Sequence, residues 1–109
     1  MLNRYTEGGV FEPHQDGHAL TILVPRSTAE ADFGGGGTAF WSEHTIGTDS
    51  TQARRHPPSL VMKPPPGTGL LWRGHLTHAG LPVTSGMRHV FVASFDLRVD
   101  VRRSMYSEE

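Results

Sequence analysis

The sequence predicts an all-β domain, arranged as a sandwich or a barrel. Short runs of β-forming residues alternate with turns that contain Gly and Pro, and no segment shows the spacing of a convincing helix. Six or seven short strands separated by such turns are typical of these architectures. The chain of 109 residues fits one domain with a single modest core, residues 1–109, and leaves no room for a second.

Three strands are expected in the first part of the chain. The first follows a turn at Gly8-Gly9 and ends at residues 14–16. Residues 19–24 form an unbroken apolar run bounded by Gly and Pro, which predicts a buried strand. The polar stretch that follows is expected to hold one helical turn, at 27–31. Four consecutive glycines then precede a strand at 38–41, because Gly permits the tight backbone of a turn.

The second part of the chain begins with a long polar segment. Residues 42–58 show no apolar periodicity and are expected to form a loop. Short strands at 59–63 and 69–72 flank a Pro-rich turn and are expected to pair as a hairpin. A stretch at 76–79 and a long strand at 87–97 complete the fold.

The residues of this last strand alternate between two faces, since successive side chains on a strand point to opposite sides. One face carries Arg88, Val90, Val92 and Ser94, and the other carries His89, Phe91, Ala93 and Phe95. Both faces are largely apolar. We therefore expect one face to line a pocket and the other to pack against a second layer.

The composition limits the possible functions. Eleven acidic and ten basic residues give a net charge of −1, which argues against nucleic acid or an anionic membrane as a partner. No run approaches the roughly 20 apolar residues of a membrane span, and the start lacks the apolar core of a signal peptide. We expect a soluble protein, cytoplasmic or, if the chain is truncated, from the endoplasmic reticulum. Because Cys is absent, any metal would need nitrogen and oxygen ligands.

Among the seven histidines, His14 has the most informative neighbour. On an extended strand, residues two apart point the same way, so the imidazole of His14 and the carboxylate of Asp16 are expected to converge. A second imidazole, from His78, would complete a set of two histidines and one carboxylate. Such a set is typical of non-haem Fe(II) oxygenases, and it leaves coordination positions open.

Several short motifs resemble a known family in their order and spacing. They are Tyr5, Gly8-Gly9-Val10-Phe11, His14-Gln15-Asp16, Thr21-Ile22-Leu23, Gly35-Gly36-Gly37-Thr38-Ala39-Phe40, Pro64, Gly67, Gly69-Leu70-Leu71-Trp72, His78-Ala79-Gly80-Leu81-Pro82-Val83 and Gly86-Met87-Arg88. Together they are similar to the catalytic domain of Fe(II)/2-oxoglutarate-dependent dioxygenases of the prolyl 4-hydroxylase and procollagen lysyl hydroxylase type. The similarity covers about residues 5–97, and the segment 76–95 is most similar to the lysyl enzymes. It implies a double-stranded β-helix, the jelly-roll fold of cupins, without the helices that usually precede it.

The resemblance also implies roles for six residues. His14, Asp16 and His78 would ligate Fe(II), and Arg88 would pair with the distal carboxylate of 2-oxoglutarate. Arginine suits that role because its planar fork donates two charge-assisted hydrogen bonds and stays charged when desolvated. Tyr5 would contribute a hydroxyl near the cosubstrate, and Thr21 would face the same region.

The implied reaction hydroxylates a prolyl or lysyl residue of a peptide or protein. 2-Oxoglutarate and O2 would be consumed and succinate and CO2 released, with ascorbate as a supporting reductant. Two alternatives remain open at this point. The chain could be a catalytically silent jelly-roll module that keeps a metal for structure or ligand recognition. It could also be a cupin-like metalloenzyme without a cosubstrate, for which Arg88 would be unnecessary.

For other residues the sequence favours a structural role. Trp41 and Trp72 are expected in the core, and Arg54-Arg55 is expected to be a solvated pair of charges. Tyr5 lies near the terminus, and fraying is the alternative to its role in the site. The remaining histidines are expected to be surface or structural residues: His18, His44, His56, His75 and His89.

Overall fold

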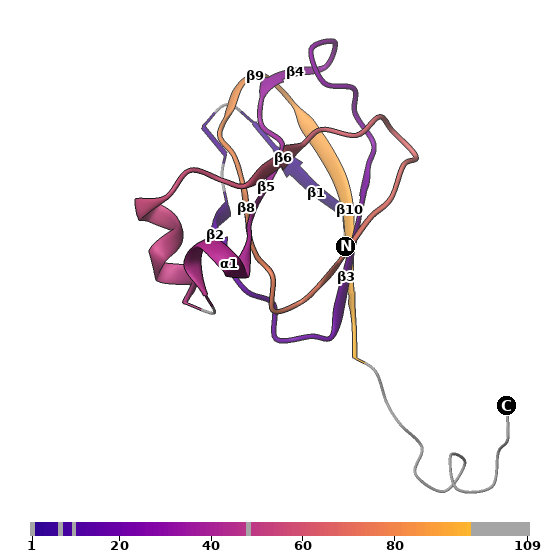
Figure 1. Ribbon diagram of the computed structural model, residues 1–109. Helices are drawn as coiled ribbons and strands as arrows, with labels where there is room; N and C mark the ends of the chain where they lie inside the picture. Colours follow the sequence, from indigo (N-terminus) through magenta and orange to yellow (C-terminus); the bar gives the residue numbers. More distant parts are fainter. Residues whose placement is uncertain (1, 7, 10, 48, 97–109) are drawn as a thin grey trace, which may run out of the picture.

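A computed structural model describes residues 2–6, 8–9, 11–47 and 49–96. The prediction of an all-β domain is confirmed, because antiparallel strands dominate the described chain (Figure 1). The elements are β1 (Leu2–Tyr5), β2 (Phe11–His14), β3 (Leu20–Pro25), β4 (Phe33–Gly35), β5 (Thr38–Trp41), α1 (Glu43–Ile46), the 3-10 helix η1 (Ser50–Arg55), β6 (Leu60–Met62), β7 (Leu70–Arg73), β8 (Thr77–Gly80), β9 (Val83–Gly86) and β10 (Arg88–Phe95).

Most of these strands belong to two four-stranded sheets. The first sheet has the order β1-β10-β3-β7, and the second has the order β2-β8-β5-β6. The short strands β4 and β9 pair separately. Strands that are neighbours in a sheet are mostly distant in sequence, so nearly every pairing is long-range. In the described chain no helix is long and apolar enough to cross a membrane.

The main core lies between the two sheets. Leu23, Trp72 and Val90 from the first sheet pack with Phe40 from the second. A second cluster lies under the helical segments, where Trp41 packs with smaller side chains, namely Ala39, Ile46, Ala53 and Ala79. Both tryptophans are buried, which confirms the expectation that they are core residues.

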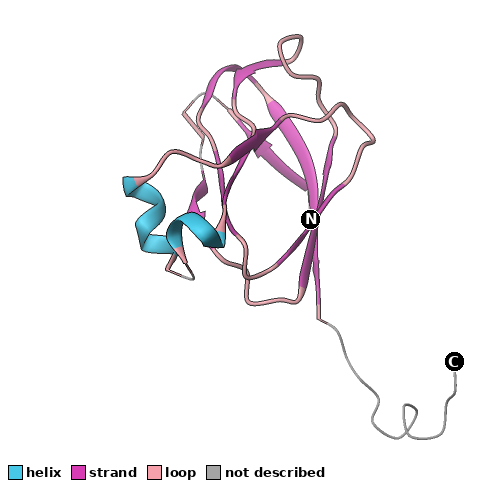
Figure 2. Cartoon of the chain, viewed as in Figure 1, coloured by secondary structure: helices cyan, strands magenta, loops and turns pink. Residues whose placement is uncertain are grey.

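The expectation that residues 42–58 form a loop is wrong, because this segment contains α1 and η1 (Figure 2). Each helix starts at a residue whose side chain accepts a backbone hydrogen bond: Ser42 from the N–H of His44 and Asp49 from the N–H of Thr51. Each buries only one apolar residue. Helices this short leave no apolar periodicity for a sequence analysis to detect.

The expected hairpin of residues 59–63 and 69–72 is also wrong. β6 pairs with β5 in the second sheet, whereas β7 pairs with β3 in the first. The Pro-rich segment between them therefore crosses from one sheet to the other. Residues 27–31 form a turn rather than a helical turn, closed by hydrogen bonds between Thr28 and Asp32.

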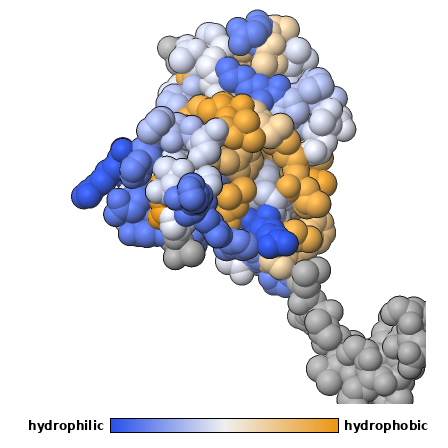
Figure 3. All heavy atoms as spheres, in the orientation of Figure 1, coloured by the Kyte–Doolittle hydropathy of each residue, from blue (hydrophilic) through white to orange (hydrophobic). Residues whose placement is uncertain are grey.

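The prediction of a buried strand at residues 19–24 is only partly right. β3 occupies this position, but burial alternates along it, so one face is buried and the other is not. The outward face of β10 is likewise uncovered by the described chain, contrary to the expected second layer. Phe91 and Phe95 are 40% and 52% exposed, and Leu71 on the same side of the sheet is 64% exposed. Figure 3 shows apolar side chains along the side of the molecule where β3 and β10 run in this view.

Candidate active site

A cavity of about 130 Å³ lies between the two sheets, and all six residues singled out in the sequence line it. The second sheet and the segment after β2 supply His14, Asp16 and His78. The first sheet supplies the other three, namely Tyr5, Thr21 and Arg88. The face of β10 that was expected to line a pocket does so, through Arg88, Val90, Val92 and Ser94.

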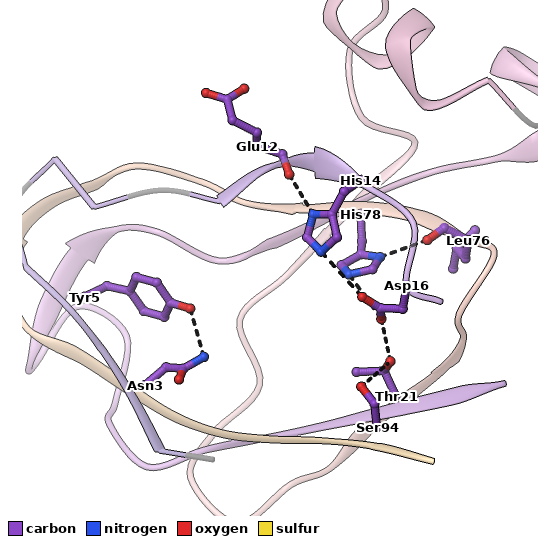
Figure 4. Close-up of polar contacts among 9 residues, drawn as sticks. All are labelled: Asn3, Tyr5, Glu12, His14, Asp16, Thr21, Leu76, His78 and Ser94. Atoms are coloured by element: carbon purple, nitrogen blue, oxygen red, sulfur yellow. Dashed lines mark hydrogen bonds and ion pairs between the residues drawn. The ribbon is translucent and has the colours of Figure 1, made fainter. Parts of the chain in front are cut away.

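The structure brings the two histidines and the aspartate together (Figure 4). His14 and His78 are cross-strand partners on β2 and β8, and their ring centroids lie 4.3 Å apart. The Nε2 atom of His14 lies 3.5 Å from Oδ1 of Asp16, and Nε2 of His78 lies 3.5 Å from Oδ2. One donor atom from each residue lies within 4.8 Å of the others. Among the described residues, this is the one such group of three or more potential metal ligands.

Both imidazoles are oriented by main-chain carbonyls. Nδ1 of His14 lies 2.7 Å from the carbonyl oxygen of Glu12, and Nδ1 of His78 lies 2.8 Å from that of Leu76. A carbonyl oxygen can only accept, so each Nδ1 must carry the hydrogen and donate it. The lone pair is then on Nε2, the atom that faces the centre of the group. Metal-ligating histidines are held in this way, so the donor set fits a divalent metal.

His78 is the more deeply buried of the two histidines, with its side chain 8% exposed against 43% for His14. Burial lowers the pKa of His78, and the hydrogen bond to Leu76 and the charge of Asp16 oppose this shift. The neutral imidazole is therefore favoured near neutral pH. That is the form that binds a metal.

Asp16 reaches the group by a different route from the one predicted. β2 ends at His14, so the alternation of side chains on a strand does not explain why the two residues converge. Instead, the backbone N–H of Asp16 donates to the carbonyl oxygen of Gly74 at 2.7 Å. Its Oδ2 atom accepts a hydrogen bond from the hydroxyl of Thr21. This contact engages the Thr21 hydroxyl. The role expected for Thr21 beside a cosubstrate stays a prediction.

Arg88 lies in the wall of the same cavity and is 5% exposed. Its Nη2 atom donates to the hydroxyl oxygen of Thr38 at 2.9 Å, and Nη1 donates to the carbonyl oxygen of Gly37 at 3.4 Å. Burial lowers the pKa of Arg88, and Tyr5 acts in the opposite direction. No Asp or Glu among the described residues forms a salt bridge with this guanidinium. A planar guanidinium in the wall of a cavity could donate charge-assisted hydrogen bonds to an anion there.

Tyr5 lies beside this guanidinium and is held in β1. It is the cross-strand partner of Arg88, whose guanidinium carbon lies 5.8 Å from the centre of the phenol ring. Asn3 donates a hydrogen bond of 3.3 Å to the phenol oxygen (Figure 4). Burial raises the pKa of Tyr5, opposed by that bond and by the charge of Arg88, so the phenol stays protonated. The structure places Tyr5 in a paired strand, whereas the alternative of fraying stays untested.

Two polar residues of the cavity were missed by the sequence analysis: Asn3 and Thr38. Ser94 was expected on the pocket-lining face of the last strand, together with Arg88, and it does line the cavity. Asn3 and Thr38 carried no signal, because their positions depend on pairing between distant strands. The five other histidines are exposed, as expected, and two of them form surface ion pairs, His18 with Asp96 and His75 with Glu43.

Gly36 allows the backbone to approach Arg88 closely. Its φ of 66° lies in the left-handed region, and a Cβ there would lie 3.0 Å from the ring of Phe33 and 3.5 Å from Cδ of Arg88. A larger residue would meet both strain and crowding at this point.

Comparison of the sequence with family models and with curated proteins finds no match.

Proposed function

We propose that the chain is an Fe(II)- and 2-oxoglutarate-dependent dioxygenase that hydroxylates a prolyl or lysyl residue of a peptide or protein. The observation that carries this proposal is the composition of one cavity. It combines two histidines and an aspartate, suited to a metal, with a buried arginine that has no carboxylate partner among the described residues.

His14, Asp16 and His78 would hold the metal. Two neutral imidazoles and one carboxylate suit Fe(II), and three protein ligands leave coordination positions open for other ligands. When bound, Fe(II) would supply the redox chemistry that couples decarboxylation of 2-oxoglutarate to hydroxylation of the substrate. The carbonyl oxygens of Glu12 and Leu76 keep both imidazoles directed at the metal position.

Arg88 would bind the distal carboxylate of 2-oxoglutarate. Its guanidinium is held by Thr38 and by the carbonyl of Gly37, so it is oriented before the ligand arrives. The neutral phenol of Tyr5 lies beside it and can donate to the same carboxylate. Apolar residues such as Leu23 and Val90 line the same cavity, and a low local dielectric there would strengthen charge-assisted bonds.

The balanced reaction consumes one 2-oxoglutarate and one O2. One oxygen atom enters the new hydroxyl group of the substrate, and the other enters succinate, with release of CO2. Ascorbate would support turnover as a reductant. The choice of a prolyl or lysyl substrate rests on the resemblance of residues 76–95, and the near-neutral charge of the chain favours a peptide over nucleic acid.

The test is formation of succinate from 2-oxoglutarate by purified protein, with and without Fe(II), in the presence of proline- or lysine-containing peptides. We expect Fe(II)-dependent turnover that is lost in His78→Ala. The matched control is His75→Ala, because His75 is an exposed histidine close in sequence to His78 and outside the cavity. Turnover retained in His78→Ala would contradict the assignment.

A second measurement separates the enzyme from a silent metal-binding module. Adding 2-oxoglutarate to the Fe(II)-loaded protein without oxygen should produce a visible metal-to-ligand charge-transfer band. Binding of Fe(II) without this band would favour the silent module. Hydroxylation of the peptide that needs no 2-oxoglutarate and persists in Arg88→Ala would favour a metalloenzyme that uses no cosubstrate.

A further inference from the structure

Two hydroxyl groups connect the carboxylate of Asp16 to the first sheet, the first bonded to the carboxylate and the second bonded to the first. Thr21 lies on β3 and Ser94 on β10, and the two are cross-strand partners. The Thr21 hydroxyl bonds Oδ2 of Asp16, and the Ser94 oxygen lies 3.2 Å from the Thr21 oxygen (Figure 4). Both hydroxyls line the cavity, and Thr21 is only 2% exposed.

Chemistry fixes the direction of this chain of hydrogen bonds. An ionised carboxylate can only accept, so the single hydroxyl hydrogen of Thr21 must point to Asp16. The hydrogen between the two hydroxyls must then come from Ser94, because Thr21 has already used its own. The order is Ser94 to Thr21 to Asp16, and each bond polarises the next.

We propose that Thr21 and Ser94 are positioning residues for the metal-binding carboxylate, and that they set how tightly this chain holds a divalent metal. This inference rests on the proposed function, because it requires the metal centre. It goes beyond it by assigning Thr21 to the metal ligand Asp16 rather than to the cosubstrate.

The geometry shows why Asp16 needs such support. It lies outside the regular strand, and its backbone is tied to Gly74 through one N–H. The two histidines, in contrast, are carried by paired strands and have rings held by carbonyls. Thr21 therefore supplies for Asp16 the orientation that the carbonyls supply for His14 and His78. Its bond engages Oδ2 and fixes the rotation of the carboxylate, which places Oδ1 toward His14.

The experiment measures binding of Co(II), as a spectroscopic probe, to purified protein and to matched variants. In Thr21→Val, which keeps the shape but removes the hydroxyl, we expect affinity for Co(II) to fall by about 10- to 100-fold. The visible absorption spectrum of the saturated variant should also change, because the carboxylate can rotate. Thr21→Ser should restore both affinity and spectrum, and Ser94→Ala should show a smaller loss, below about tenfold.

The control is Thr77→Val. Thr77 is also 2% exposed and adjoins His78, but its hydroxyl is 3.4 Å from the Gln15 amide rather than bonded to a member of the metal-binding group. We expect Thr77→Val to keep the affinity and the spectrum. An equal loss in Thr77→Val and Thr21→Val would overturn the inference, since the cause would then be packing. So would a Thr21→Val variant that binds Co(II) within about twofold of the unsubstituted chain.

Folding is checked by circular dichroism of each variant without metal. If Thr21→Val does not fold, Ser94→Ala decides, because Ser94 is exposed and its removal leaves the core intact. Unchanged affinity and an unchanged spectrum in Ser94→Ala would then overturn the inference. If the unsubstituted chain binds no Co(II), the metal centre itself fails and this inference falls with it. If the unsubstituted chain binds Co(II) and the variants bind it equally well, only this inference is refuted. The proposed metal centre is then unaffected.

Discussion

Arg88 on β10 and Thr38 on β5 join the two sheets at one end of the cavity. The guanidinium of Arg88 donates a 2.9 Å hydrogen bond to the hydroxyl of Thr38. This bond orients a cation that has no carboxylate partner among the described residues. Because burying a charge costs stability, we propose that Arg88 serves in binding rather than in stabilising the core.

Replacing Arg88 by Met should weaken binding of 2-oxoglutarate and leave the thermal stability nearly unchanged. Loss of a charge-assisted interaction with the proposed cosubstrate should raise the Kd for 2-oxoglutarate by about 10- to 100-fold. The same change removes a desolvated charge, so the midpoint of thermal unfolding should not fall by much. Isothermal titration and a melting curve measure the two effects. Arg73→Met is the control, because Arg73 is an exposed arginine on β7 and outside the cavity. A Kd unchanged in Arg88→Met would remove Arg88 from the site.

The metal-free protein should lose stability in mild acid because of His78. Burial gives this histidine a lower pKa in the folded chain than its ordinary value of about 6.5 in the unfolded chain. The unfolded chain therefore takes up the proton first, and the free energy of unfolding falls as the pH drops from above 6.5 through the folded pKa. Urea unfolding between pH 5 and 8 measures the slope, with pH values chosen to bracket about 6.5. In His78→Gln the slope should be smaller, and an unchanged slope would contradict this origin.

Addition of metal should stabilise the fold through the three proposed ligands. A ligand that binds only the folded state at about 100 times its Kd contributes about 2.7 kcal/mol. We expect Co(II) to raise the melting temperature of the unsubstituted chain, and His14→Ala to remove most of this increase. His18→Ala should keep the full increase, because His18 is exposed and pairs with Asp96 instead. Equal increases in both variants would show that the metal binds elsewhere.

Gly74 should tolerate no side chain. A Cβ at this position would collide with the carbonyl group of His18 and lie 3.1 Å from the carbonyl oxygen of Asp16. We expect Gly74→Ala to lower the free energy of unfolding by roughly 1–3 kcal/mol and to weaken metal binding, because Gly74 also accepts the hydrogen bond from the backbone of Asp16. Gly17→Ala is the control, since nothing lies within 4 Å of a Cβ there. Equal effects of both substitutions on unfolding in urea would argue against the collision.

The sequence was informative wherever a property is local. Strand composition and Gly or Pro turns located β3, β5 and β10, and alternation along β10 identified Arg88 and Ser94 as neighbours on one face. Spacing alone also selected His14 and Asp16, although the strand geometry invoked for them was wrong. The correct reason, a bond from Asp16 to Gly74, joins residues that only the fold brings together.

What the sequence did not reveal depends on pairing between distant segments. β1 was missed because four residues near the start carry little pattern, and their role follows from the pairing of Tyr5 with Arg88. The crossing of the Pro-rich segment between sheets was missed because turn residues look alike in a hairpin and in a crossover. α1 and η1 were missed because their caps, rather than periodic apolar residues, define them.

The pairing of β1 with β10 also affects when the site can form during synthesis. These are the first and last described strands, so Tyr5 and Arg88 cannot meet until almost all of the described chain has left the ribosome. Ser94 also lies on β10, so its hydrogen bond to Thr21, which supports Asp16, forms equally late. Folding of a topology with so many non-local pairs is slow compared with a helical domain of the same size. A nascent chain should therefore complete this cavity, and the proposed metal centre in it, only after translation of β10 is complete.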